Sequence, residues 1–246
     1  MKLYLLFGLS LALSISGAHM ATISIKNNCP YTIWPGILTG NNGAQLGANS
    51  GFDLAQQATK SVDVPATWIA GLIWARTGCS SNSGTFSCAT ANCGSGQVAC
   101  NGHGAAPPVT LAEFTLSAAN NANQDTYDIS NVDGFNLPLS ISPQGGSGAT
   151  CKTTSCQKDI NAACPAALAK KGSDGATIAC KSACVAFNEP QYCCTGEFEP
   201  RGACKPSTYS QFFKEQCPQA YSYAQDDQSS TFTCSGKPDY LVTFCP

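Results

Sequence analysis

Short runs in which apolar and polar residues alternate recur along the whole chain. In residues 21–29, Ile23 and Ile25 alternate with Thr22 and Ser24, which is the period of a β-strand with one buried face. Further β-prone runs occupy residues 31–36, 68–76, 109–116, 126–132, 136–142 and 239–246. Short strands at this spacing, separated by Gly, Pro and Asn turns, predict a β-sandwich or a flattened barrel.

Two inserts interrupt the strand pattern. Residues 77–101 hold four cysteines among Gly, Ser, Ala and Asn, which is too little apolar surface for a core, so two local disulfides are expected to fix this loop. Residues 158–217 are rich in cysteine, and Cys180 and Cys184 stand four positions apart, a spacing that places them on one face of a helix. This second insert is therefore predicted to be a small helical subdomain held by disulfides.

A further helix is predicted within the second insert, over residues 207–218. Tyr209, Phe212 and Phe213 would form one apolar stripe. The segment begins with a Ser or Thr cap and stops at Pro218, as helices in globular proteins do.

The first twenty residues have the pattern of a secretory signal peptide. One lysine is followed by an apolar run from Leu3 to Ile15 and then by small residues. The run is too short to span a bilayer comfortably, so we expect no transmembrane segment. Removal of residues 1–20 takes away one lysine and no acid, which changes the formal net charge from −2 to −3. The mature chain, residues 21–246, is expected to be secreted to an extracellular or vacuolar compartment.

Sixteen cysteines, all outside the signal peptide, dominate the composition. In an exported chain they favour eight disulfides, because paired thiols persist in oxidising compartments. A zinc site is disfavoured, since His103 is the one histidine of the mature chain and the cysteines lack zinc-site spacing. We expect no metal and no cofactor. The negative charge and the lack of a polybasic cluster also argue against nucleic acid as a partner.

The chain lacks the motifs of the common nucleophilic and nucleotide-dependent enzymes. There is no Gly-X-Ser-X-Gly elbow, phosphate loop or dinucleotide fingerprint. His103, in a Gly-rich segment before Pro-Pro, is interpreted as a solvated loop residue rather than a catalytic base. Carboxylates remain as the candidates for chemistry.

Acidic residues without sequence-local counterions mark the middle of the chain. No Lys or Arg lies between Arg76 and Lys152, whereas Glu113, Asp128 and Asp133 fall in this interval. Each has a simple structural interpretation: a half-solvated strand face for the first two and an Asn-Val-Asp-Gly turn for Asp133. Alternatively the acids converge on one groove, where a close pair acts on glycosidic bonds or accepts hydrogen bonds from sugar hydroxyls.

Several segments together resemble the thaumatin-like proteins, the pathogenesis-related group five of plants. They are CNGHGAAPPVTLAEFTL, DISNVDGFNLP, CKSACVAF, PQYCC, CPQAYSYAQDDQSSTFTC and the ending VTFCP. The resemblance covers essentially all of the mature chain, with sixteen cysteines in the family's order. It implies a mainly β fold: an antiparallel β-sandwich core (21–76, 102–157 and 218–246), a small disulfide-bonded loop subdomain (77–101) and a disulfide-rich helical subdomain (158–217).

The resemblance also implies how the cysteines pair. Carried onto this sequence, the family's pattern gives Cys29–Cys245, Cys79–Cys88, Cys93–Cys100, Cys151–Cys234, Cys156–Cys217, Cys164–Cys180, Cys184–Cys193 and Cys194–Cys204.

The family further implies an acidic cleft between the sandwich and the helical subdomain, lined by one arginine, one glutamate and three aspartates. The acids correspond to Glu113, Asp128, Asp133 and Asp226. The arginine is replaced by Leu72. Arg76 lies on the same strand face but about 13 Å further along, too far to substitute. Without that positive charge, mutual repulsion is expected to raise the pKa of at least one acid, with Glu113 the foremost candidate.

By resemblance, the chain is expected to be a monomeric, secreted, antifungal defence-type protein that binds β-1,3-glucan of fungal cell walls. Some members have weak endo-β-1,3-glucanase activity, for which Glu113 would be the proton donor and one of Asp128, Asp133 or Asp226 the second carboxylate. Neighbouring aromatic residues are predicted to offer sugar-facing surfaces, namely Tyr127, Phe135 and Tyr223. The alternative for Phe135 is a place in the core.

The sequence leaves three functions open. An enzyme and a pure binding module would use the same groove. An enzyme inhibitor, or a protein accumulated in stress or ripening, would act through another surface.

Overall fold

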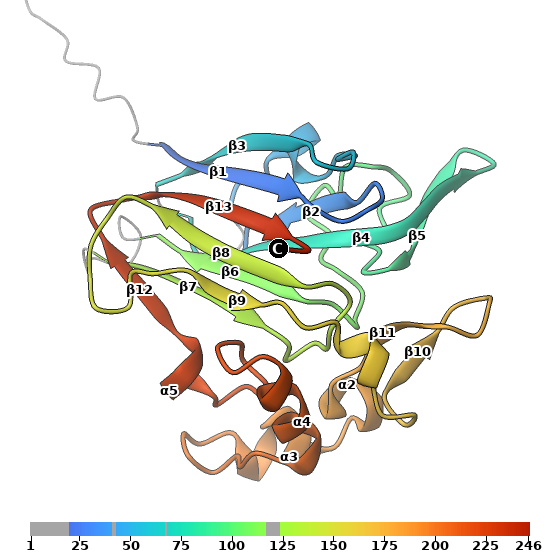
Figure 1. The fold of residues 1–246 in the computed structure, drawn as a ribbon, viewed down its shortest axis with the longest axis vertical. Coiled ribbons are helices and arrows are strands. Elements are labelled where there is room, and N and C mark those ends of the chain that lie inside the picture. Colours follow the sequence, from blue (N-terminus) through green and yellow to red (C-terminus); the bar gives the residue numbers. More distant parts are fainter. Residues whose placement is uncertain (1–19, 41–42, 67, 117–123) are drawn as a thin grey trace, which may run out of the picture.

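The computed structural model describes residues 20–40, 43–66, 68–116 and 124–246, so the predicted signal peptide, apart from Met20, lies outside it. Two sheets packed face to face form the main body (Figure 1). The five-stranded sheet has the order β3 (Thr59–Pro65), β1 (Met20–Asn27), β13 (Asp239–Phe244), β8 (Leu139–Gln144) and β9 (Thr154–Cys156). The six-stranded sheet has the order β12 (Phe232–Ser235), β7 (Gln124–Ser130), β6 (Leu111–Thr115), β4 (Gly71–Asn82) and β2 (Trp34–Leu38), with β5 (Thr85–Thr90) paired to β4.

The predicted sandwich is confirmed, with one departure from a wholly antiparallel arrangement. Strand β1 runs parallel to β13, and the other strand pairs are antiparallel. Because β1 and β13 come from opposite ends of the described chain, the middle of the five-stranded sheet forms only when both ends are in place.

The core lies between the two sheets. Ile23 and Ile25 are fully buried, as their alternation with polar residues predicts. Tyr240 of one sheet packs against Phe114 and Tyr127 of the other, with ring centroids 5.2 and 5.3 Å apart. These aromatic contacts join the inner faces of the two sheets.

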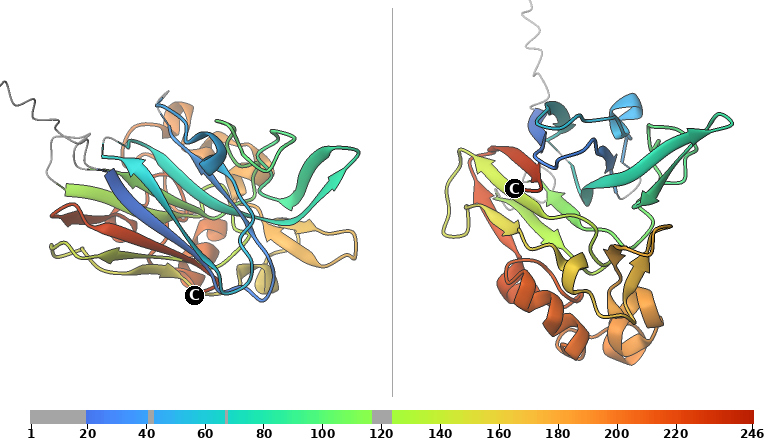
Figure 2. Two further views of the ribbon diagram at one scale, coloured as in Figure 1. Left: turned by 90° about the horizontal axis from the view of Figure 1, so that it is seen from above. Right: turned by 45° about the vertical axis from the view of Figure 1, so that its right-hand side comes forward.

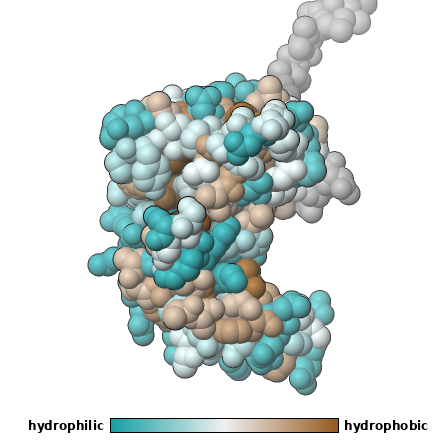
Figure 3. All heavy atoms as spheres, turned by 90° about the vertical axis from the view of Figure 1, so that its right-hand side faces the viewer, coloured by the Kyte–Doolittle hydropathy of each residue, from teal (hydrophilic) through white to brown (hydrophobic). Residues whose placement is uncertain are grey.

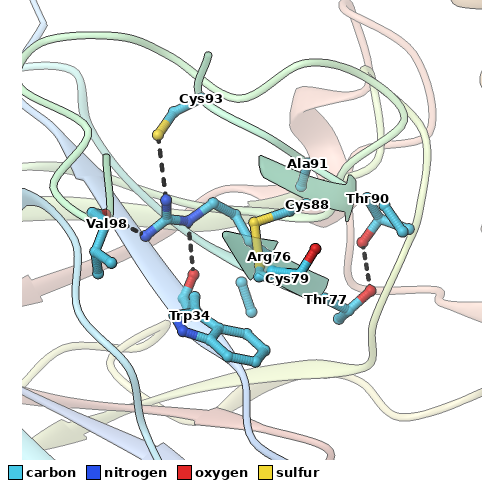
Figure 4. The surroundings of a disulfide bond; sticks show 12 residues. Trp34, Arg76, Thr77, Cys79, Cys88, Thr90, Ala91, Cys93 and Val98 are labelled. Atoms are coloured by element: carbon cyan, nitrogen blue, oxygen red, sulfur yellow. Dashed lines mark hydrogen bonds between the residues drawn. A yellow bond between two sulfur atoms is a disulfide. The ribbon is translucent and has the colours of Figure 1, made fainter. Parts of the chain in front are cut away.

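The range 77–101 begins as a hairpin rather than as a loop, because β4 continues through it and pairs with β5. Arg76, at the base of the hairpin, is fully buried. Its guanidinium donates to the carbonyl oxygens of Trp34 (3.0 Å) and Val98 (2.7 Å) and to Sγ of Cys93 (3.4 Å) (Figure 4). Burial lowers its pKa to about 10. Arg76 therefore anchors this insert to the sandwich.

Helices and a second hairpin gather below the sheets (Figure 2). They comprise η2 (Ile160–Ala163), β10 (Ala169–Lys171), β11 (Thr177–Cys180), α2 (Ala183–Phe187), α3 (Pro190–Cys193), η3 (Gly196–Phe198), α4 (Thr208–Gln216) and α5 (Asp227–Ser230). A further short helix, η1 (Gly47–Ser50), follows β2.

The predicted helix over residues 207–218 is confirmed as α4. Ser207 forms a capping box with Ser210, and Phe213 is buried while Tyr209 and Phe212 pack against the core. The prediction that Cys180 and Cys184 share a helical face is wrong, because Cys180 ends β11.

The reason for this error is local. Ser182 caps α2 by accepting a hydrogen bond from the Val185 amide, so the helix begins only after it. Before the cap, Cys180 exchanges backbone hydrogen bonds with Phe135 and continues a β-strand.

All sixteen cysteines form disulfides, and none is free. The eight pairs coincide with those that the resemblance implies. The pair Cys29–Cys245 spans 216 positions and covalently closes almost the whole described chain.

Candidate functional site

Strand pairing places Glu113 and Asp128 side by side on the outer face of the six-stranded sheet. They are register partners in β6 and β7, and Leu72 of β4 pairs with Glu113 from the other side. The flanking residues Ala112 and Phe114 point into the core, which directs Glu113 outward. One apolar and two acidic side chains therefore stand in a row across three strands.

A hollow of about 190 Å³ opens over this row. Its lining consists of Ala70, Leu72, Glu113, Phe114, Thr115, Thr126 and Asp128. The molecule is visibly notched between the part that carries the sheets and the lower part that carries the helices (Figure 3). We call the hollow and the acids around it the acidic cleft.

The carboxyl groups of Glu113 and Asp128 are direct neighbours, within hydrogen-bonding reach of each other. Burial raises the pKa of both, and that of Asp128 lies well above its usual range. Two carboxyl groups can hydrogen-bond when one of them carries a proton, so one proton can serve the pair. This interaction raises the pKa of Asp128 and lowers that of Glu113, against the larger effect of burial. Oδ1 of Asp128 is buried and has no hydrogen-bond partner among the described residues.

Asp133 approaches the pair from the turn after β7. Burial raises its pKa, and its charge contributes to the raised pKa of Glu113. The turn is held by a hydrogen bond from the Val109 amide to the Asp133 carbonyl oxygen (3.2 Å). Gly134 follows with a φ of 96°, a conformation that favours glycine. The turn thus fixes Asp133 on the same side of the sheet as Glu113.

The contacts of Asp226 are made with α4 and with the segment before α5. Its carboxylate forms a half-buried ion pair with Lys214 of α4 (2.7 Å). It also accepts hydrogen bonds from the amide and the hydroxyl of Ser222 (3.0 and 2.8 Å). With its charge paired in this way, Asp226 joins α4 to the segment before α5.

Asp227, which the sequence analysis did not name as a site residue, affects the pKa of a cleft residue instead. Its charge contributes to the raised pKa of Asp128, and it accepts a hydrogen bond from the Tyr221 hydroxyl (2.9 Å). Burial and the charges of Asp128 and Asp227 raise the pKa of Tyr221. The pair of adjacent aspartates in the sequence was the available signal, but sequence alone does not show which of the two faces the strands.

Tyr127 and Phe135 are fully buried, so neither offers the predicted sugar-facing surface, and Phe135 takes its alternative place in the core. Alternation along β7 sends Tyr127 to the side opposite Asp128, where its hydroxyl donates to the Lys152 carbonyl oxygen (2.7 Å). Tyr223 is half-buried, and the charges of Asp226 and Asp227 contribute, after burial, to its raised pKa.

A comparison with known families matches residues 27–246 to the model of the thaumatin family. The chain belongs to the thaumatin family. Thaumatin-like protein 1 of Prunus persica is 60% identical over 235 residues, covering 95% of this chain and 94% of that protein. Thaumatin-like protein 1 of Castanea sativa is 57% identical over the full length of both chains. A Prunus avium protein named glucan endo-1,3-beta-glucosidase is 58% identical, covering 95% of this chain and 94% of that protein.

Within this thaumatin-family chain, the described residues contain no group of three or more side chains suited to hold a metal ion. No helix in the same ranges is long and apolar enough to cross a membrane.

The Leu72→Arg variant is expected to lower the pKa of the Glu113–Asp128 pair. Cross-strand neighbours lie about 4.5–5.5 Å apart at Cβ, and a positive charge at that range favours the ionised carboxylate by about 1 pKa unit or more. Carbon-detected NMR titration of both proteins measures the change, with Leu72→Met as the uncharged control. Identical curves for the native protein and Leu72→Arg would show that position 72 does not act on the pair.

The same substitution has a consequence for stability with a defined sign. A carboxyl whose pKa is raised in the folded state costs stability as pH rises from its unfolded pKa through its folded pKa. Leu72→Arg lowers the folded pKa and reduces that loss. The difference in the free energy of unfolding, Leu72→Arg minus native, should therefore be more positive at pH 7 than at pH 3.

Proposed function

We propose that this protein is an exported defence-type protein whose acidic cleft binds β-1,3-glucan of fungal cell walls and hydrolyses it slowly. The observation that carries the proposal is the half-buried pair of neighbouring carboxyl groups, Glu113 and Asp128, beneath an open hollow. Carboxyl oxygens at the floor of a hollow can accept hydrogen bonds from the hydroxyls of a bound sugar. The family and the relative named as a β-1,3-glucosidase support this choice of ligand.

The geometry refines the roles of the acids in hydrolysis. Retaining glycosidases need carboxyl groups about 5 to 5.5 Å apart and inverting ones about 6.5 to 9.5 Å. Glu113 and Asp128 are register partners on β6 and β7, and their carboxyl groups interact as direct neighbours. The pair is therefore assigned as the proton donor, and burial, together with the charge of Asp133, raises the pKa of Glu113 within it. Asp133 is the second carboxylate, because Lys214 neutralises Asp226.

Antifungal action and export follow as parts of the same proposal. Eight disulfides suit an oxidising compartment outside the cytosol, and the first twenty residues carry the predicted export signal. Binding to wall glucan would bring the protein to the fungal surface.

The native protein is expected to be retained on insoluble β-1,3-glucan more strongly than on chitin or cellulose. The Glu113→Gln variant should lose most of this retention, because it removes the shared proton and the charge that order the cleft. A sedimentation assay with the three polysaccharides measures both effects. Equal retention on all three would reject the proposal in favour of an inhibitor or accumulated protein that acts through another surface.

A further inference from the structure

A second hollow, larger than that of the acidic cleft, lies elsewhere on the described part of the chain. It measures about 750 Å³ and shares no lining residue with the cleft. We call it the Tyr31 groove. Its walls include Tyr31, Trp34, Thr77, Leu137, Asp159 and Ile178. The volume falls within the range of small-molecule and oligosaccharide pockets, about 300 to 1,000 Å³.

The walls of the groove come from separate parts of the fold. The β4–β5 hairpin and the β10–β11 hairpin project on the same side of the molecule (Figure 1). Lys170 of β10 donates a hydrogen bond to the Ala89 carbonyl oxygen of β5 (2.8 Å), which connects them. The turn that carries Tyr31 and the start of η2 supply further parts of the wall.

An exposed aromatic ring, one unsatisfied amide oxygen and a carboxylate share this groove. Tyr31 is 46% exposed, which makes it one of three large apolar residues at the described surface. Oδ1 of Asn161 is buried and has no hydrogen-bond partner among the described residues, although its amide nitrogen donates to the Asn136 carbonyl oxygen (3.0 Å). Asp159 uses one carboxylate oxygen to cap η2. Its charge contributes, after burial, to the raised pKa of Tyr31, which places the two groups close together.

The side chains that line the groove indicate the chemical class of its ligand. Asp159 and Asn161 offer acceptors, so the ligand must supply donors. The lining includes no Lys or Arg, which disfavours an anion. Tyr31 offers a ring face, which packs against apolar surface. A sugar ring has this combination, with hydroxyl donors at its edge and C–H groups on its face.

A hydrogen bond and two disulfides brace the walls of the groove. Arg76 donates a hydrogen bond to the carbonyl oxygen of Trp34 (Figure 4). The Cys79–Cys88 disulfide joins β4 to β5 in the hairpin that forms one wall. Cys245, which also lines the groove, is joined to Cys29 beside the Tyr31 turn. Preformed walls reduce the entropy lost on binding.

We propose that the Tyr31 groove is a second binding site, for a neutral oligosaccharide, with Tyr31 as the stacking surface and Asp159 and Asn161 as hydroxyl acceptors. This site is independent of the proposed function of the acidic cleft. A chain with two separate saccharide sites would hold a polysaccharide wall more firmly than either site alone.

The test uses the full mature protein carrying Glu113→Gln, which impairs the acidic cleft. A linear β-1,3-linked glucose hexamer is titrated into the ¹⁵N-labelled protein. Saturable shifts are expected at the amides of Thr32 and Thr177, which line the groove. Tyr31→Ala should weaken binding roughly five- to tenfold, and Tyr31→Phe, which keeps the ring, should weaken it less. Val98→Ala is the matched control, because Val98 is also exposed but lies outside the groove.

Three outcomes would overturn the proposal. They are the absence of shifts at Thr32 and Thr177 at millimolar hexamer, equal weakening by Tyr31→Ala and Val98→Ala, and a response of the groove to peptides but not to the hexamer. The acidic cleft is judged separately by comparing retention on insoluble glucan of Tyr31→Ala with that of the double variant Tyr31→Ala and Glu113→Gln. Shifts at Thr32 and Thr177 without a difference between those two variants would uphold the Tyr31 groove and reject only the function of the cleft.

Discussion

Glu113→Gln and Asp133→Asn are each expected to slow the proposed hydrolysis of β-1,3-glucan by roughly 10²- to 10⁴-fold, the usual contribution of general acid–base catalysis. In Glu113→Gln the amide no longer shares a proton with Asp128. In Asp133→Asn the second carboxylate is lost while the hydrogen-bonded pair remains. Release of reducing ends from soluble β-1,3-glucan measures the rate, and binding of the same glucan measured separately distinguishes lost chemistry from lost affinity.

Asp53→Asn is the matched control for these two variants. Asp53 is exposed and lies outside the acidic cleft, so the same carboxylate-to-amide change should leave the rate unaltered. Asp226→Asn should weaken the contact with Lys214 and lower stability more than rate. A loss of rate in Asp226→Asn with full activity in Asp133→Asn would reverse the assignment of the second carboxylate.

The pH dependence of hydrolysis follows from the shared proton. Because the pKa of the pair is raised, the proton donor stays protonated to a higher pH than an isolated carboxyl group would. The rate should fall as pH rises through that raised pKa. Leu72→Arg, which lowers the pKa, should move this decline to lower pH.

Removal of the Cys29–Cys245 disulfide by a double substitution to alanine is expected to lower the free energy of unfolding by about 5 kcal/mol in the chain-entropy model. The bond spans 216 positions, so the unfolded chain gains more freedom from its loss than from that of any other pair. For a chain of this size the melting temperature should fall by roughly 10–20 °C. Denaturant unfolding and calorimetry check the two values.

The double substitution Cys79→Ser and Cys88→Ser provides the comparison. This pair closes a span of nine positions, for which the same model gives a loss of about 2.6 kcal/mol. Both double variants avoid an unpaired thiol. Equal losses from the two would contradict the explanation by loop length.

The sequence by itself determined the elements that depend on local pattern. Alternation in residues 21–29 predicts β1 because each buried isoleucine faces the same side. The Ser207 cap and the apolar stripe predict α4, since both act within a few residues. The order of sixteen cysteines, through the family resemblance, gave the disulfide pairs.

Only the tertiary structure decided which side chains meet. Alternation alone could not show that Tyr127 faces the core, because the inward face of β7 is defined by the other sheet. Asp226 and Asp227 are adjacent in sequence, yet the packing of α4 pairs the first with Lys214 and leaves the second to act on Asp128. The Tyr31 groove arises between hairpins far apart in sequence. Local patterns fix strands and caps, whereas contacts between distant segments depend on how those elements pack.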